Sequence, residues 1–422
     1  MREATVADTA TGVPATLLAP FAALDEHALE WCVLDEDPGA GGPTVARLLV
    51  ADAGAARRAL MSAGLISLGR TGRAPSELFV GYDEPRTTWL RIEVTTRLDL
   101  GPLRALGELT GQGCLARRVR RGSAAFLAGD DAFWALLLQA AFAGARVAPG
   151  TGRRLAELAR HARHDGELGR LLDDIGPRGW GSAQVLERAR AGDVTIMAPL
   201  RQELERAYRR GCSRAARLRH LADRGARAAA GARVGGSGLS LALVAPDGAG
   251  KSTLAAGLRD ALPVPVCVVY MGMRHDGAGR GPDAWVLPRL ARQWRRYLVG
   301  RYNVARGRVV IFDRYSYDAL LPGPRAPDPL RRARRWLFSH AVPPPHVGVL
   351  LDAPGEVMFR RKGEHDAHSL ERRRAHYLRL AARVPRLVVV DATRPPEEVQ
   401  RVVSRLLWRT WTRRRSASRG RS

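Results

Sequence analysis

Lysine is almost absent from this chain of 422 residues, which has Lys251 and Lys362 among its 68 basic residues. Arginine therefore serves as the general surface cation, and its use along the whole chain explains the formal net charge of +26. Because acidic residues are interleaved with these arginines, the charge is weak support for nucleic-acid binding. Arginine is a wide planar fork, so we expect the rare lysines where a compact ammonium group is needed.

Cysteine is also scarce. The four cysteines lie far apart, without a CxxC pair or clustered histidines, at Cys32, Cys114, Cys212 and Cys267. This spacing argues against a zinc site and against a disulfide framework. We expect reduced thiols, with Cys267 filling a strand.

Long apolar runs are missing as well. The most apolar helical stretch, 133–148, is interrupted by Gln139 and Arg146 and is too short to cross a membrane. Glu3 and Asp8 occupy the stretch where a secretory signal would have its apolar core. We therefore expect no membrane span, no secretory signal and a cytoplasmic location.

A length of 422 residues favours more than one domain. The composition, with 45% hydrophobic and 26% charged residues, is typical of a folded protein. We predict a mixed α+β domain at 1–125, a helical extension with a basic connector at 126–234, an α/β domain at 235–411 and a disordered basic tail at 412–422. The Gly-rich stretch 231–238 marks the main boundary.

The basic connector, 201–233, contains ten arginines against three acidic residues. We expect a solvated helical connector, and the alternative is a face that binds anions or a partner. Elsewhere in the first half of the chain, the periodicity predicts helices at 21–30 and 53–63, strands at 31–34, 46–50, 77–80 and 89–94, and mainly helix from 130 to about 227.

Short apolar runs alternate with helical patterns after the Gly-rich stretch. The runs at 239–244, 264–270, 309–312, 347–351 and 387–390 are continuous and rich in β-branched residues, as in strands buried on both faces. Helices are expected between and after them at 251–262, 285–305, 356–362, 369–383 and 396–407. Such alternation predicts a doubly wound parallel five-stranded sheet, whose ligands bind at the carboxyl ends of the strands.

A phosphate-binding motif follows the first of these strands. The sequence APDGAGKST, at 245–253, matches the Walker A pattern except that Ala245 replaces the first glycine. Backbone amides of such a loop surround phosphate groups at the start of a helix. We expect Lys251 to reach the β- and γ-phosphates of ATP and the Ser252 hydroxyl to bind Mg²⁺. The other residues expected to bind the nucleotide are Asp247, Gly248, Ala249, Gly250 and Thr253.

A second metal-binding acid is expected near this loop. Asp313 ends an apolar strand and is followed by Arg314, which is able to hold a second anion. Asp352, at the end of another strand, is the competing candidate. An Asp that merely pairs with its neighbouring Arg in a turn remains the alternative interpretation of Asp313.

A basic segment contains Arg360, Arg361 and Lys362 at the end of an expected helix. Cations that close over a transferring phosphoryl group neutralise its equatorial oxygens, so we predict a catalytic role for the two arginines. The alternative is a set of basic residues that simply stabilises a helix C-terminus.

Together, DGAGKST, ARGRVVIFDRY, LLDAPGEVMFRRKGEHD, RRRAHYLRLA and VVVDATRPPEEV resemble thymidylate kinases in order and spacing, over 239–403. The resemblance implies a P-loop kinase fold with ATP and Mg²⁺, and a nucleoside monophosphate similar to dTMP as the phosphate acceptor. It implies that Asp247 contacts the acceptor's sugar hydroxyl, that Arg314 holds its phosphate and that Asp313 binds the metal. It also makes Arg360 and Arg361 lid arginines and places 391–395 near the adenine.

One segment departs from the family. Thymidylate kinases follow the second strand with Arg-Glu-Pro-Gly-Gly, which grips the monophosphate, whereas 270–275 here is YMGMRH. Arg274 is a candidate substitute. The acceptor pocket is therefore altered, and phosphoryl transfer is better supported than dTMP as the acceptor.

The N-terminal region resembles nucleotidyltransferases in the segments WCVLDED, VARLLVADAGAARRAL, WLRIEVTTRLDLG and DDAFWALLLQAA. Active members have a DxD pair where this chain has Val45, Ala46 and Arg47. Glu93 alone cannot hold two Mg²⁺ ions. We predict a degenerate, non-catalytic domain that is regulatory or binds the acceptor.

The lead hypothesis is an ATP-dependent nucleoside-monophosphate kinase that works by positioning and charge neutralisation. The alternative is an ATP-binding regulatory or assembly protein, in which the basic connector or tail contacts nucleic acid or another anionic partner. Nucleic acid is the less favoured partner, and a homodimer is left open.

Overall fold

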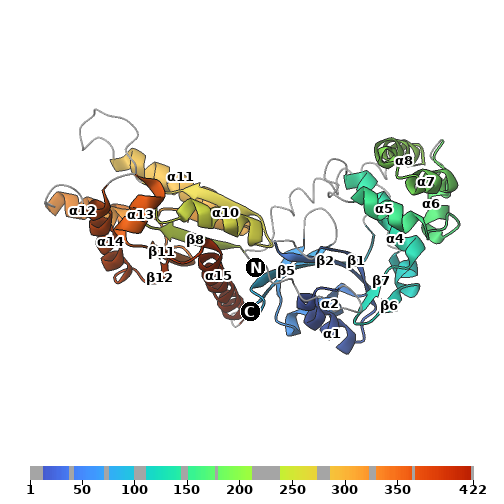
Figure 1. Cartoon of the computed structure of the whole chain (residues 1–422), viewed down its shortest axis with the longest axis horizontal. Helices are drawn as coiled ribbons and strands as arrows, with labels where there is room; N and C mark the ends of the chain where they lie inside the picture. Colours follow the sequence, from blue (N-terminus) through green and yellow to red (C-terminus); the bar gives the residue numbers. More distant parts are fainter. Residues whose placement is uncertain are drawn as a thin grey trace. The chain divides into compact units, whose positions relative to one another are not determined.

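A computed structural model of the chain describes residues 13–37, 42–70, 76–98, 111–143, 151–175, 179–211, 238–272, 286–322, 329–363 and 366–419 (Figure 1). The chain divides into two compact units. The first comprises Met1–Gly39, Thr44–Val80 and Leu90–Gly231, and the second comprises Ala40–Pro43, Gly81–Trp89 and Ala232–Ser422.

A mixed sheet with the strand order β3-β4-β5-β2-β1-β7-β6 forms the centre of the first unit. β1 pairs antiparallel with β2, whereas β2 pairs parallel with β5 and β1 parallel with β7. The strands are β1 (Trp31–Asp37), β2 (Thr44–Val50), β3 (Ile66–Arg70), β4 (Glu77–Asp83), β5 (Thr88–Thr95), β6 (Val119–Arg121) and β7 (Ala124–Phe126). The sequence predicted β1, β2, β4 and β5 but not the three short strands β3, β6 and β7.

Two helices cover one face of this sheet: α1 (Leu18–Glu26) and α2 (Ala53–Ser62). Phe21 packs on Trp31 with ring centroids 4.7 Å apart, within a core that α1, α2 and the sheet share. Asp52 starts α2, because its side chain accepts hydrogen bonds from the first free amides of the helix, at 2.7 and 3.2 Å.

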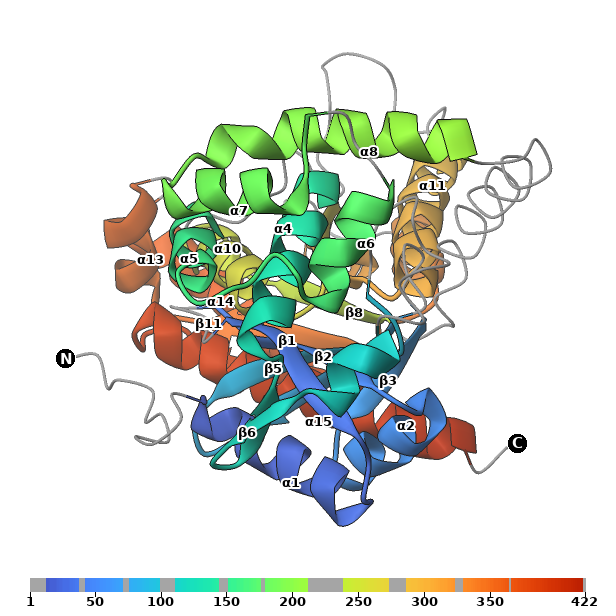
Figure 2. The same cartoon turned by 90° about the vertical axis from the view of Figure 1, so that its right-hand side faces the viewer.

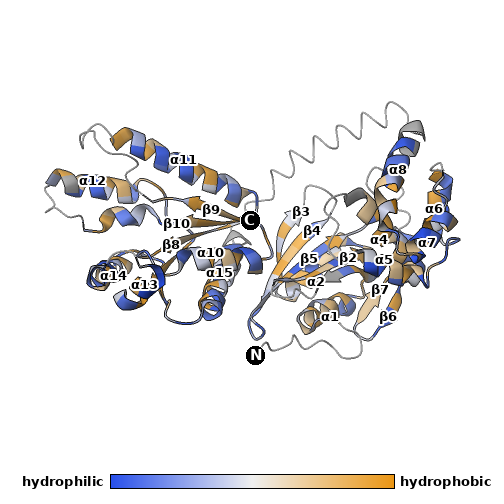
Figure 3. Cartoon of the chain, turned by 45° about the horizontal axis from the view of Figure 1, so that its top comes forward, coloured by the Kyte–Doolittle hydropathy of each residue, from blue (hydrophilic) through white to orange (hydrophobic). Residues whose placement is uncertain are grey.

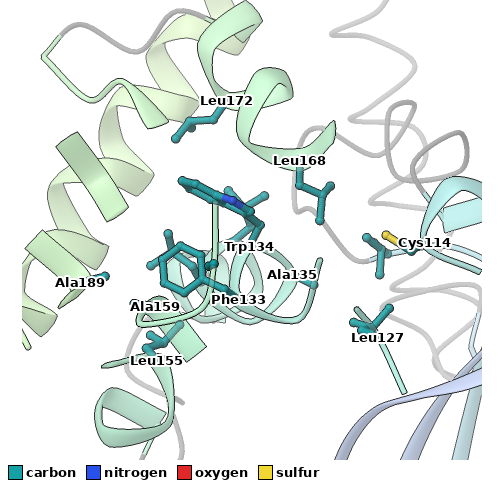
Figure 4. Close-up of a cluster of buried hydrophobic side chains, with 14 of the residues drawn as sticks. Cys114, Leu127, Phe133, Trp134, Ala135, Leu155, Ala159, Leu168, Leu172 and Ala189 are labelled. Carbon is teal, nitrogen blue, oxygen red and sulfur yellow. The ribbon is translucent and has the colours of Figure 1, made fainter. Parts of the chain in front are cut away.

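A helical subdomain follows the sheet, as the sequence predicted. It contains α4 (Gly129–Ala143), α5 (Thr151–Ala159), α6 (Glu167–Ile175), α7 (Ser182–Arg190) and α8 (Met197–Gly211), and α8 packs on α4 and α6 (Figure 2). Its core surrounds Phe133 and Trp134 (Figure 4), and the Trp134 indole donates to the Arg163 carbonyl at 2.9 Å. The rest of the expected connector, and the Gly-rich stretch apart from Gly238, lie outside the described residues.

The second unit contains a five-stranded sheet in which every strand is parallel, in the order β12-β11-β8-β10-β9. This confirms the predicted sheet. The strands are β8 (Leu239–Val244), β9 (Val266–Tyr270), β10 (Val309–Asp313), β11 (Val347–Asp352) and β12 (Leu387–Asp391). β8 is buried along its whole length, but the expectation of burial on both faces is wrong for the edge strands β9 and β12, where Val268 and Val389 are exposed.

Helices connect and follow these strands: α10 (Lys251–Ala261), α11 (Val286–Ala305), the 3-10 helix η5 (Ser316–Leu320), α12 (Pro329–His340), α13 (Gly355–Lys362), α14 (Ala367–Ala381) and α15 (Pro396–Arg419). The sequence predicted all of these except η5 and α12. None of the helices that the structure describes combines the length and apolarity needed to cross a membrane.

The expectation of a disordered tail from Thr412 is wrong as far as Arg419, because α15 continues to that residue. Trp411 is only 1% exposed and anchors the last part of the helix. The hydroxyl of Ser416 donates to the Thr412 carbonyl one turn earlier, at 3.3 Å. Arginine is a good helix former, so a basic segment held by one buried Trp does not need an apolar repeat to stay helical.

Three cysteines lie within the described residues, and all of them are free thiols: Cys32 and Cys114 are buried, and Cys267 is half-buried in β9. Burial raises the pKa of the Cys32 thiol to about 12. Cys212 lies outside the described residues. No cluster of three or more metal-binding side chains occurs in the part of the chain that the structure describes.

Candidate active site

The loop between β8 and α10 has the backbone shape that its glycines predict. Gly248 and Gly250 have φ values of +88° and +97°, which disfavour residues with a side chain, and Gly250 caps α10. A Cβ atom on Gly248 would lie 2.6 Å from the carbonyl oxygen of Met358 in α13. Ala245 is fully buried and is not among the residues with positive φ, so the absent first glycine of the motif has no conformational cost here.

Lys251 turns back onto this loop. Its Nζ atom donates to the carbonyl oxygens of Ala245 and Pro246 at 3.0 and 2.9 Å and lies 3.7 Å from Oδ1 of Asp247. Burial lowers the pKa of Lys251, and the charge of Arg314 adds to this shift. A compact ammonium group is thus held at the centre of the loop, while Ser252 and Thr253 are exposed in the first turn of α10.

Arg314 joins the neighbouring strand end to the same loop. Its Nη2 atom donates to Oδ1 of Asp247 at 2.6 Å, and its Nη1 atom lies 3.4 Å from Oδ2 of Asp318 and 3.5 Å from the hydroxyl of Tyr377. Arg314 has φ of +65°, and its backbone amide donates to the Leu243 carbonyl at 2.9 Å. Parallel pairing of β10 with β8 therefore places this guanidinium beside the loop.

Charges in this cluster affect one another. Burial alone would lower the pKa of Arg314, but the carboxylate of Asp318, with Tyr377 and Asp247, raises it overall. Burial also raises the pKa of the Asp318 carboxyl, although Arg314 opposes that shift. Sequence analysis missed Asp318 and Tyr377. Asp318 offered a local signal, because it follows Arg314 by four residues, but Tyr377 offered none.

Asp313 ends β10 opposite Leu243 of β8 and Tyr270 of β9. Its Oδ1 atom is buried and has no hydrogen-bond partner among the described residues. A buried carboxylate oxygen normally has a donor or a cation beside it. The Asp313 carboxylate and the Ser252 hydroxyl are hard oxygen ligands of the kind Mg²⁺ prefers, so this donor set is compatible with the ion.

Asp352, the competing acid, is engaged elsewhere. The guanidinium of Arg374 donates to both of its carboxylate oxygens, at 2.6 and 2.9 Å, and also to Glu371 at 2.9 Å. Glu371 in turn accepts from the backbone amide of Gly355 at the start of α13. This network ties α14 to the end of β11, and Asp352 is a structural partner in it.

The basic residues of α13 are not gathered at the loop. Arg361 donates to the carbonyl of Ala392, after β12, at 2.9 Å, and Arg360 is exposed at the helix end. In the parts of the chain that the structure describes, no hydrogen bond or ion pair joins either arginine to residues 245–250. Lys362 is the last residue of α13 and is exposed. The loop touches α13 instead through Gly248 and Met358.

Hydrogen bonds within the turn after β12 hold the first of the remaining expected site segments. The carboxylate of Asp391 accepts from the amide and hydroxyl of Thr393 at 2.9 and 2.6 Å, which fixes the turn after β12 and lowers the pKa of Asp391. Arg274 lies outside the described residues.

Arg296 of α11, which sequence analysis overlooked, donates to the Gly272 carbonyl at 3.1 Å and lies over the ring of Tyr270.

In the first unit, Arg47 and Arg91 form a charged network with Glu93. Arg47 pairs in register with Glu93, its Nε atom lies 3.8 Å from the Glu93 carboxylate, and it donates to Gln139 at 2.9 Å. Arg91 also pairs with Glu93. Two guanidinium groups thus neutralise Glu93, the acid that was considered for metal binding.

No family model matches this chain, and no curated protein matches it. Among solved structures, a thymidylate kinase from Candida albicans is similar at 17% sequence identity, with a TM-score of 0.34. The match covers 42% of this chain and 93% of the other. Likeness at this level does not establish an activity for this chain.

Proposed function

We propose that the second unit is an ATP- and Mg²⁺-dependent phosphotransferase that acts on a nucleoside monophosphate. The observation that carries the proposal is the hydrogen bond of 2.6 Å from Arg314 to Asp247. It brings an anion-binding guanidinium into contact with the loop that holds Lys251, at the carboxyl edge of a parallel sheet where ligands of such sheets bind.

The donor side of the site consists of the loop amides from Asp247 to Thr253 and the ammonium group of Lys251. The Lys251 ammonium donates hydrogen bonds to two carbonyl oxygens of the loop. A triphosphate offers stronger, charged acceptors, so Lys251 exchanges these carbonyls for phosphate oxygens. Ser252 and Asp313 would hold Mg²⁺, whose chemistry there is to neutralise charge on the β- and γ-phosphates.

The acceptor side is built around Arg314. Its fork is shared between Asp247 and Asp318, and a phosphate group of the acceptor would compete with Asp318, the more distant of the two carboxylates, at 3.4 Å. Arginine recognises phosphate with two parallel hydrogen bonds, so this exchange is chemically favourable. Asp247 then remains available for a sugar hydroxyl, as in the thymidylate kinases that the sequence resembles.

Catalysis in this scheme rests on position and charge rather than on a covalent enzyme intermediate. Arg360 and Arg361 lie on α13, which touches the loop at Gly248. For Arg361 to reach a transferring phosphoryl group it must leave the Ala392 carbonyl. We therefore assign the two arginines to a closed state of the site that forms with both substrates bound.

The experiment is an acceptor screen with the full chain. Purified protein, ATP and Mg²⁺ are combined with single nucleoside monophosphates, nucleosides and sugar phosphates, and ADP and the phosphorylated product are measured together. We expect ADP in step with one phosphorylated nucleoside monophosphate. ATP hydrolysis without any phosphorylated acceptor would instead favour an ATP-binding regulatory or assembly protein.

For the first unit, we propose a non-catalytic role. The pairing of Glu93 with Arg47 and Arg91 supports this, because a carboxylate neutralised by two guanidinium groups is a poor ligand for two Mg²⁺ ions. Glu93→Gln is expected to leave ATP turnover by the second unit unchanged. A fall in turnover would link that carboxylate to the activity.

A further inference from the structure

The outward side of α11 is apolar along its whole length. Leu287, Ala291, Trp294, Leu298 and Tyr302 repeat at the spacing of one helical face. Leu287 is 78% exposed, and Leu298 and Tyr302 are each 56% exposed. We call these five residues the α11 stripe.

The buried side of the same helix is partly polar. Its buried residues are Gln293, Gly300, Asn303 and Val304, of which Asn303 donates to a helix carbonyl and accepts from Arg308. Gly300 lies against the ring of Phe312. A helix of a globular protein normally buries its apolar face, and α11 does bury Val304 in the core of the second unit. The α11 stripe is a second apolar face, and it is exposed. Packing within the second unit does not explain the α11 stripe.

Positive charge accompanies the stripe. α11 contains five arginines and no acidic residue. Arg295 and Arg301 are exposed, and helical spacing puts them on opposite flanks of the stripe. An apolar strip between arginines, with a Trp and a Tyr within it, is the composition of helices that lie in the interface of an anionic membrane.

The next helix extends this surface. α12 contains four arginines and no acidic residue, and it exposes Leu330 (64%), Trp336 (61%) and Leu337. The Gln293 side-chain amide donates to the Phe338 carbonyl at 3.5 Å, which joins α11 to α12. In Figure 3 hydrophobic and hydrophilic residues alternate along both helices.

Charge decides among the surfaces able to cover these helices. A second copy of the chain would bring arginines of α11 and α12 against the same arginines, with no acidic residue in either helix to pair with them. Nucleic acid would satisfy the arginines but would leave four exposed leucines and two tryptophans without an apolar partner. An anionic lipid surface satisfies both, because acyl chains accept the apolar side chains while headgroups pair with guanidinium groups.

We propose that the face formed by α11 and α12 binds an anionic lipid surface, with Trp294, Leu298 and Trp336 inserted among the lipids and the arginines at the headgroups. The binding is peripheral. It places the second unit at a membrane without a spanning helix, and it does not depend on the activity proposed above.

The test is cosedimentation of the full chain with vesicles of phosphatidylcholine alone and of phosphatidylcholine with phosphatidylglycerol. We expect binding to the anionic vesicles, weakened by added salt. Trp294→Ser with Leu298→Ser should weaken it by roughly tenfold or more, because each inserted side chain contributes apolar burial. Arg295→Gln should weaken it by roughly fivefold. Thermal unfolding of each variant checks that the fold is retained.

Two matched control variants test whether vesicle binding depends on this face or on any exposed apolar or basic residue. Val389→Ser removes an exposed apolar residue of β12, and Arg372→Gln removes an exposed arginine of α14. Both should bind vesicles as the wild type does. Equal losses in the controls, binding to neutral vesicles alone, or no vesicle binding would overturn the proposal. A wild-type dimer that dissociates in the variant with Trp294→Ser and Leu298→Ser would also overturn it, because a second copy would then cover the face. So would binding of a random DNA duplex that prevents the protein from binding vesicles.

Discussion

The Nη2 atom of Arg314 lies 2.6 Å from the Oδ1 atom of Asp247, so the residue after β10 is bonded to the loop after β8. Arg314 adopts φ of +65° to make this contact. A left-handed backbone at a residue with a long side chain costs on the order of 1–3 kcal/mol and persists only where its surroundings hold it. Here the hydrogen bond from its backbone amide to the Leu243 carbonyl and the ion pairs with Asp247 and Asp318 hold it.

Arg314→Lys tests the acceptor assignment. A lysine keeps the charge but lacks the fork that contacts Asp247 and an acceptor phosphate together. We expect the KM for the acceptor to rise by roughly tenfold or more, with the KM for ATP little changed. The control is Arg374→Lys, which removes a similar fork from Asp352. Steady-state kinetics with each substrate varied would contradict the assignment if both variants raised the acceptor KM equally.

Asp313→Asn and Asp352→Asn separate the two candidate metal ligands. Asp313 has a buried oxygen without a partner among the described residues, whereas Asp352 is neutralised by Arg374. We expect Asp313→Asn to lower turnover by about 10²–10³-fold and to raise the Mg²⁺ concentration needed for half-maximal rate. Asp352→Asn should keep its Mg²⁺ dependence and lose stability instead. The reverse pattern in a Mg²⁺ titration would exchange the two roles.

Gly248→Ala and Gly250→Ala compare two left-handed glycines. Each alanine would pay about 1–2 kcal/mol for its backbone conformation. At Gly250 the new methyl group meets open space, but at Gly248 it would lie 2.6 Å from the Met358 carbonyl oxygen. We therefore expect Gly248→Ala to be the more destabilising in urea unfolding. Equal free energies of unfolding would mean that the contact between the loop and α13 is not maintained in solution.

The stability of the second unit is expected to fall in mild acid through His346. Burial, with the nearby charges of Arg414, Arg301 and Arg386, lowers the pKa of His346 to about 3. Its Nδ1 atom accepts the Ser240 amide at 2.8 Å, and protonation there would abolish that bond. Between pH 6.5 and 3, His346 is therefore protonated in the unfolded chain but neutral in the folded one.

That difference lowers the free energy of unfolding by up to about 1.4 kcal/mol per pH unit as the pH falls. His346→Asn, which offers an acceptor atom without a titration in this range, should flatten the dependence. Urea unfolding of both proteins at pH 7, 6, 5 and 4 measures it. The same slope in both would exclude His346 as the cause.

Much of the second unit could be predicted because its signals are local. β8 is one continuous apolar run. The loop after it has positive φ at positions 248 and 250, which favours glycine at both. The same holds for Asp313, since an apolar run in a parallel sheet delivers its last residue to the ligand edge. Such features depend on residues that are adjacent in the chain, so one sequence is enough to predict them.

The remainder depends on contacts between distant segments. Tyr377 reaches Arg314 from α14, 63 residues away, and no local pattern announces that pair. Likewise, Trp411 keeps α15 helical through burial that the arginine-rich tail sequence does not reveal. In α11 the apolar periodicity predicted a helix, but it could not show that the apolar side faces outward.

The most direct test of the account is ATP-dependent phosphorylation of a nucleoside monophosphate by the wild type, Lys251→Ala and Lys251→Arg. We expect formation of ADP and product by the wild type and a loss of about 10³-fold or more in both variants, because neither offers a compact ammonium group to the phosphates. Circular dichroism and thermal unfolding should show an intact fold. Turnover at the wild-type rate in Lys251→Ala would contradict the phosphate-binding role of the loop and, with it, the proposed function.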